Sequence, residues 1–202
     1  MIPKGNNPRL NRINTDVKGL RINRSYVAHF QVPAANAIAA STTGVHAAVI
    51  DTGVQQVITT NINSPAVPRA ITVTAGGTAA DIKAIQVVVE GTNYADEVIT
   101  ETLPAFTVDT PGTVTGTKAF KTVTKITIPA HDGTGATTAI GFSEVLGLPY
   151  KLAHNTVLAA YADNVKESTA PTVTVSATAL ESNTIDLNTA LSGKVIDAYL
   201  MV

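Results

Sequence analysis

The chain has 202 residues and a formal net charge of −1, and only 14% of its residues are charged, against roughly 25% in ordinary soluble domains. It has no cysteine, which excludes disulfides and thiolate metal sites, and no run approaches the roughly 20 apolar residues of a membrane-spanning helix. The length suits one domain, or one domain with an arm, and the small net charge argues against general nucleic-acid binding.

Residues 1–32 show neither a helical nor a strand period, and their charge differs from that of the remaining chain. Residues 1–25 hold six basic and one acidic side chain, a net charge of +5, whereas residues 26–202 carry a net charge of −6. Isolated apolar side chains are spaced as if each fills a separate pocket. We expect an extended basic arm that docks on an acidic protein surface, although a disordered tail has the same composition. The candidate contact residues are Arg9, Leu10, Arg12, Ile13, Leu20, Arg21, Ile22 and Arg24.

Residues 33–202 are expected to form a single domain. The Ala-rich segment 32–41, with Pro33 near its start, predicts one short helix. An apolar run at 46–50 and a strand at 54–62 follow. The two prolines of SPAVPR (64–69) predict an extended corner that leads into the centre of the domain.

Residues 69–142 carry the strongest pattern of the chain. Runs rich in β-branched residues, such as RAITVTAGG (69–77), IKAIQVVVEG (82–91) and KAFKTVTKITIP (118–129), end at Gly, Pro, Asp or Asn. The segment TPGTVTG (110–116) reads as a turn, and HDGTG (131–135) as another. This alternation is typical of short antiparallel strands with one buried face and one largely solvated face.

The last third of the chain continues the β pattern. We expect a Pro-containing connector at 145–152, strands at 156–163 and 172–177, an exposed loop at 164–171 and a loop-like segment at 180–193. Residues 194–202 predict a closing strand whose end is tucked into a sheet or an interface. The fold class is therefore all-β: an antiparallel β-sandwich or barrel-like sandwich with an N-terminal arm and at most one short helix.

No arrangement of residues predicts a catalytic, cofactor or metal site. The four histidines are far apart in the sequence, and none has a second ligand at helical or strand spacing. The sequence around His131 and Asp132 reads as an Asp-Gly turn, and no serine lies in a nucleophile elbow. No phosphate loop or calcium loop is present. We therefore expect a protein that is not an enzyme and binds no cofactor.

Three segments carry a resemblance to a known class of proteins. They are GVHAAVIDTGVQQVITTNINSPAVPRAITVTA (44–75), GTKAFKTVTKITIPA (116–130) and GLPYKL (147–152), together with the closing strand. With them, the chain from Gly44 onward resembles virion structural proteins of tailed bacteriophages, of the head decoration (capsid cement) type. The resemblance carries no functional residue, and the arm has no counterpart in it.

The resemblance implies a protein that is made in the host cytoplasm and binds the outer capsid surface of the virion, where it stabilises the shell. Its partners would be the major capsid protein and further copies of itself. Three-fold positions on capsids favour a homotrimer, which the low-charge surface and the apolar C-terminus also suit. A tail module (tube, fibre or host contact) is the alternative, and a bacterial surface β-domain is a third possibility.

Overall fold

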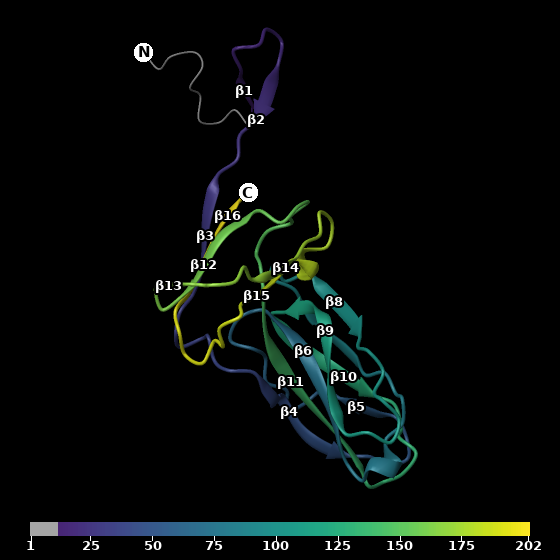
Figure 1. Cartoon of the computed structure of the whole chain (residues 1–202). Helices are drawn as coiled ribbons and strands as arrows, with labels where there is room; N and C mark the ends of the chain where they lie inside the picture. The colour runs from purple at the N-terminus through teal and green to yellow at the C-terminus, as the bar shows by residue number, and fades with distance from the viewer. Residues whose placement is uncertain (1–11) are drawn as a thin grey trace.

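The computed structural model describes residues 12–202, and their strands form four sheets in which all pairs run antiparallel. Two single turns of 3₁₀ helix, η1 (Ala79–Asp81) and η2 (Leu180–Ser182), are the only helical elements in this part of the chain. The predicted all-β fold, consistent with a β-sandwich, is confirmed (Figure 1).

The largest sheet is built around the long strand β11. Its strand order is β14-β15-β11-β6-β9, and β4 also pairs with β11. The bounds are β4 (Ser41–Ile50), β6 (Arg69–Gly77), β9 (Gly112–Phe120), β11 (Ala136–Gly147), β14 (Thr172–Thr174) and β15 (Thr184–Asp186). β6 is central in this sheet, so Arg69 and Thr72 are buried together with its apolar side chains, whereas Thr74 is half-buried.

A second sheet completes the sandwich, with the strand order β5-β10-β7-β8. Its strands are β5 (Gln56–Ile58), β7 (Val88–Thr92), β8 (Val98–Thr102) and β10 (Thr122–Ile128). Alternate side chains of the two sheets meet in a first hydrophobic core that includes Ile71, Val89, Phe120, Ile126 and Ile140. This core arises from the period-2 pattern of residues 69–142, since side chains alternate across a strand.

A third sheet, with the order β13-β12-β16-β3, covers a second core at the other end of β11. Its strands are β3 (Val27–Val32), β12 (Val157–Ala162), β13 (Val165–Lys166) and β16 (Ile196–Met201). Phe30, Ile196 and Leu200 from this sheet pack with Leu146 of β11 and Ile185 of β15. β11 therefore contributes to both cores and joins the two ends of the molecule.

The fourth sheet is a small hairpin of β1 (Arg12–Asn14) and β2 (Arg21–Asn23). It projects beyond β3, away from the sandwich (Figure 1). The expected arm ends earlier than residue 32, because residues 27–32 are strand β3 of the third sheet. Phe30 and Val32 are buried in the second core, so this segment belongs to the folded domain.

Several expected elements differ in the structure. The helix expected at 32–41 is wrong: the chain makes a single turn, in which Asn36 and Ala37 donate their N–H groups to the carbonyl of Pro33, and β4 begins at Ser41. The Ala37 carbonyl accepts the N–H of Gly193 (2.7 Å), which holds the turn against a distant loop.

The segment 118–129 is two strands and not one. β9 ends at Phe120 and β10 begins at Thr122, so Lys121 is the corner where the chain passes from one sheet to the other. The segment 110–116, which reads as a turn in the sequence, mostly belongs to β9 because it pairs with β6. In the same way, pairing with β11 and β14 makes residues 184–186 of the expected loop a strand.

Candidate docking surface

The hairpin β1–β2 is the most exposed element of the described chain that carries candidate site residues. Its register pairs Ile13 with Ile22 and Arg12 with Asn23. The connecting turn is closed by the N–H of Thr15, which donates to the carbonyl of Leu20 (3.2 Å). Gly19 lies in this turn with a φ of +85°, a left-handed conformation that glycine adopts without strain. The hairpin is therefore ordered by its own hydrogen bonds.

The structure brings most of the predicted contact residues together on this hairpin. Arg12 and Ile13 lie on β1, Arg21 and Ile22 lie on β2, Leu20 ends the turn, and Arg24 lies in the linker to β3. Arg9 and Leu10 lie outside the described residues. Leu20 is 50% exposed, Ile22 is 47% exposed and Val17 is 61% exposed. The role of these residues stays a prediction. The side chains of Arg12, Leu20, Arg21 and Ile22 are exposed, and that of Arg24 is half-buried.

The linker from the hairpin runs directly into the third sheet. Tyr26 and Val202 exchange both backbone hydrogen bonds (2.9 Å each), so the C-terminus extends the pairing of β3 with β16 by one residue. The C-terminus was expected to be tucked into a sheet. Leu200 is fully buried, whereas Met201 is 40% exposed and Val202 is 42% exposed at the sheet edge.

The outer face of the third sheet carries an aromatic and polar cluster that the sequence analysis did not identify. The ring of His29 stacks on Tyr199 with 4.7 Å between centroids, and Tyr161 meets Tyr199 edge-on at 6.0 Å. The Asp197 carboxylate accepts a hydrogen bond from Gln31 (2.8 Å) and lies 2.6 Å from His29 Nε2. The alternation in YVAHFQV (26–32) would have indicated such a face, had these residues been treated as a strand.

The hairpin and the remaining molecule have net charges of opposite sign. The described hairpin and linker hold Arg12, Lys18, Arg21 and Arg24 against a single acid, Asp16. Residues 26–202 hold eight basic and fourteen acidic side chains. Three lysines there form exposed or half-exposed ion pairs with Asp96, Glu90 and Asp132. Surface pairs of this kind contribute little to stability, so the surplus of acidic groups remains the main electrostatic feature.

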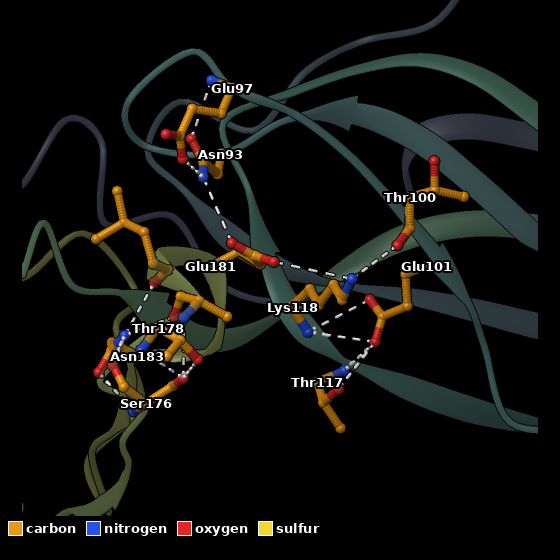
Figure 2. Close-up of polar contacts among 12 residues, drawn as sticks. Asn93, Glu97, Thr100, Glu101, Thr117, Lys118, Ser176, Thr178, Glu181 and Asn183 are labelled. Atoms are coloured by element: carbon orange, nitrogen blue, oxygen red, sulfur yellow. Dashed lines mark hydrogen bonds and ion pairs between the residues drawn. The ribbon is translucent and has the colours of Figure 1, made fainter. Parts of the chain in front are cut away.

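A cluster of polar contacts around Glu101 and Lys118 connects β8, β9 and η2. The Glu101 carboxylate on β8 accepts the N–H of Thr117 (2.6 Å), its hydroxyl (3.0 Å) and the N–H of Lys118 (3.2 Å) on β9 (Figure 2). The Lys118 ammonium donates to the carbonyl of Thr100 (2.9 Å) and lies 3.8 Å from Glu181 of η2. Because two backbone N–H groups of β9 donate to the Glu101 carboxylate, this side chain has a structural role in joining β8 to β9.

Asn183, which follows η2, holds the adjacent loop in the same structural manner. Its side-chain oxygen accepts the N–H groups of Leu152 (3.0 Å) and Ser176 (2.8 Å), and its amide donates to the carbonyl of Ala179 (2.8 Å) (Figure 2). The side chain is fully buried, which explains why each polar atom has a partner. Asn183 thus fixes the segment 172–186, whose regular elements β14, η2 and β15 are each only three residues long.

Two buried basic groups have pKa values below their ordinary range. Burial lowers the pKa of Arg69 to about 10, and the Glu144 carboxylate partly opposes this shift. The guanidinium stays charged at neutral pH, donates to the carbonyl of Ile38 (2.8 Å) and lies 4.6 Å from the centroid of the Phe142 ring. Burial also lowers the pKa of His131, while Asp51 and Asp132 act in the opposite direction.

His131 and Asp132, which the sequence placed in a turn, do not form a catalytic pair. His131 accepts the backbone N–H of Lys83 at Nδ1 (3.1 Å), and its Nε2 lies 3.0 Å from the hydroxyl of Thr138. Its own backbone N–H donates to Asp51 (3.0 Å). Asp132 points to solvent and pairs with Lys83 (2.9 Å). The histidine therefore links two loops to β11.

Grooves on the described surface are shallow and hold no cluster of reactive groups. One groove of about 270 Å³ runs between β12 and residues 166–171. Its carboxylate, Glu167, accepts the N–H groups of Asn188 (2.9 Å) and Thr189 (3.2 Å), which closes a loop. Among residues 12–202, no group of three or more histidine and carboxylate side chains is placed to hold a metal ion. No helix in this range is long and apolar enough to span a bilayer.

Comparisons of the chain with protein-family models, with curated proteins and with solved structures found no match.

Proposed function

We propose that this protein is a non-enzymatic structural protein of a tailed-bacteriophage virion, a decoration protein that binds the outer capsid surface and stabilises the shell. The observation that carries the proposal is the projecting hairpin β1–β2, which presents arginine side chains next to exposed Leu20 and Ile22. The resemblance of residues 44–152 and of the closing strand to such proteins supports the choice of assembly.

The hairpin is suited to docking because it combines long-range attraction with short-range contacts. Its arginines are attracted to an acidic surface and form paired hydrogen bonds with carboxylates. Leu20 and Ile22 are about half exposed, so burial of the exposed part of each side chain contributes on the order of 1 kcal/mol. The turn and the strand pairing already hold the hairpin in shape, which reduces the ordering cost on binding. Repetition over a symmetric shell multiplies modest affinities by avidity.

In this proposal the partners are the major capsid protein and further copies of the chain, with no nucleic acid, membrane or cofactor. The protein is made in the host cytoplasm and located on the capsid surface of the virion. The homotrimer expected from the sequence stays a prediction, because the structure holds a single copy.

A tail location is the alternative that one observation favours. Tail-tube subunits carry a long hairpin, and the hairpin β1–β2 of this chain projects from the sandwich (Figure 1). Such subunits also pack an α-helix on their sheet, and residues 12–202 contain none. Immunogold labelling of intact particles separates head from tail, because the label then lies on the shell or on the tail.

The experiment for the docking role reverses the charge of the hairpin in a variant with R12E, R21E and R24E. We expect this variant to fold normally and to lose co-sedimentation with particles that lack the protein. The matched control is K151E, K166E and K194E, which makes the same change in net charge at side chains with no described ion pair. Equal binding by both variants would show that the hairpin is not the attachment element.

A further inference from the structure

The third sheet ends in a strand whose outer edge has no partner strand among residues 12–202. β3 is the last strand in the order β13-β12-β16-β3, and its one neighbour is β16. Its sequence, VAHFQV, contains no lysine, proline or bulge. Monomeric proteins use these features to protect an edge strand from pairing with another chain. The unprotected edge of β3 is therefore a candidate surface for strand addition.

The register shows which backbone groups the edge presents. Tyr26 exchanges both of its hydrogen bonds with Val202, so this is a hydrogen-bonded pair of the antiparallel ladder. Such pairs alternate along the strands, so the N–H and C=O groups of the even residues of β3 point to β16. The groups of Val27, His29 and Gln31 point outward. In β16, the N–H of Met201 donates to the carbonyl of Thr156, the residue just before β12. The backbone groups of the odd residues of β16 therefore point to β12 and those of its even residues to β3, as the alternation requires.

We infer that β3 pairs with β3 of a second copy across a two-fold axis, so that the two third sheets become one continuous antiparallel sheet. An axis at His29 sets Val27 of each copy opposite Gln31 of the other. All three outward-facing residues then fall in hydrogen-bonded pairs, and no other antiparallel register uses the whole edge. The proposal extends the self-association that is part of the proposed function and names the surface and the symmetry.

The charges of the chain favour a second copy as the occupant. The hairpin and the sandwich lie at opposite ends of β3 (Figure 1). A two-fold axis perpendicular to the sheet turns the second copy end for end. It therefore brings the sandwich end of each copy toward the hairpin of the other. The described hairpin and linker hold four basic side chains and one acidic one, and residues 26–202 carry a net charge of −6, so this arrangement brings parts of opposite net charge together.

The outer face of the sheet adds contacts at the same seam. Val27 is 64% exposed and lies opposite Met201, which is 40% exposed. His29 is held by its stacking on Tyr199 and by Asp197. In the paired sheet, the His29 side chains of the two copies become direct neighbours on this face. This arrangement makes a dimer the basic unit, in place of the homotrimer expected from the sequence.

Cysteine pairing tests the register, because the chain has no cysteine of its own. We expect no disulfide-linked product from V27C alone or from Q31C alone, since neither position faces itself across the axis. A mixture of the two folded variants should give a disulfide-linked heterodimer under mild oxidation. Absence of this product, with circular dichroism showing both variants folded, would overturn the proposal.

Light scattering during size exclusion tests the stoichiometry on the full chain. We expect a dimer of the 20.9 kDa chain, loss of the dimer in V27K, and an unchanged dimer in V57K. Val57 is an exposed valine (52%) on another edge strand, so it controls for the substitution itself. A monomer or a trimer in the wild type would contradict the proposal. V27K keeps all hairpin arginines, so its binding to particles tests the docking role separately.

Discussion

At the scale of single residues, the buried polar groups decide how the stability of the protein depends on pH. His131 is 6% exposed, and burial holds its pKa below the ordinary value of 6.5. Its Nδ1 accepts the N–H of Lys83, so protonation removes this acceptor as well as placing a charge in a poorly solvated site. Burial raises the pKa of Asp186 above its ordinary value of 3.8, and the carboxylate of Glu144 is a second cause of this shift. The folded chain therefore holds this proton more tightly than the unfolded chain, so the contribution of Asp186 to stability increases as the pH falls, opposite to that of His131.

We predict that the free energy of unfolding falls as the pH decreases below about 6.5. The unfolded chain then binds more protons than the folded chain, because the pKa of His131 is lower in the folded state. The slope contributed by one such histidine is at most about 1.4 kcal/mol per pH unit. H131N should be less stable at neutral pH and should have a flatter profile between pH 6.5 and the acid side.

Urea unfolding at several pH values measures this difference, with H154N as the control at an exposed histidine. Asp186 is present in all three proteins, so its opposite contribution cancels in the comparison. A pH profile of H131N parallel to that of the wild type would show that His131 does not set the acid sensitivity.

At the scale of elements, β3 and the hairpin before it have different roles although they are adjacent in the chain. The strands of the hairpin pair with each other, whereas β3 pairs along its whole length with β16 and buries Phe30 and Val32. We predict that a chain starting at residue 25 unfolds at nearly the same temperature as the full chain. A chain starting at residue 33 should lose at least about 3 kcal/mol or fail to fold, because the second core loses two large side chains.

Thermal unfolding followed by circular dichroism distinguishes the two truncations. Equal stability of both chains would show that β3 belongs to the arm and that the domain begins after residue 32. A strong loss in the shorter deletion would mean that the hairpin contributes to folding, in addition to the docking role proposed for it.

At the scale of the whole molecule, the two hydrophobic cores share one strand. β11 places Ile140 in the first core and Leu146 in the second, and both side chains are fully buried. We predict that I140A and L146A each destabilise the protein by about 2–5 kcal/mol and that both lower one common transition. A strand that runs through both cores cannot lose its pairing in one of them without weakening the other.

Two probes test this coupling. Far-ultraviolet circular dichroism reports on all sheets, whereas tyrosine fluorescence reports on the second core, since Tyr94 and Tyr150 pack against it and Tyr161 and Tyr199 lie on the sheet that covers it. Coincident curves are expected for the wild type and both variants. Two separate transitions, one for each substitution, would show that the cores unfold independently.

The sequence by itself determined the fold class and the central strands. Alternating β-branched residues between Gly, Pro and Asn turns favour antiparallel strands wherever the chain finds a neighbour, so residues 69–77, 122–128, 157–162 and 196–201 were recognisable. The charge difference between the first 25 residues and the remaining chain is also a property of the sequence. It predicts a docking element, and this role stays a prediction.

Only the tertiary structure decided the boundaries and the surfaces. YVAHFQV is a strand because β16 lies beside it, and residues 184–186 are a strand because β11 and β14 do. Strand pairing joins segments far apart in the chain, so no local pattern states which edge stays free. The Ala-rich segment failed as a helix for the same reason: Gly193 binds the carbonyl of Ala37, and a contact with a distant loop outweighs a local helical preference of a few tenths of a kcal/mol per residue.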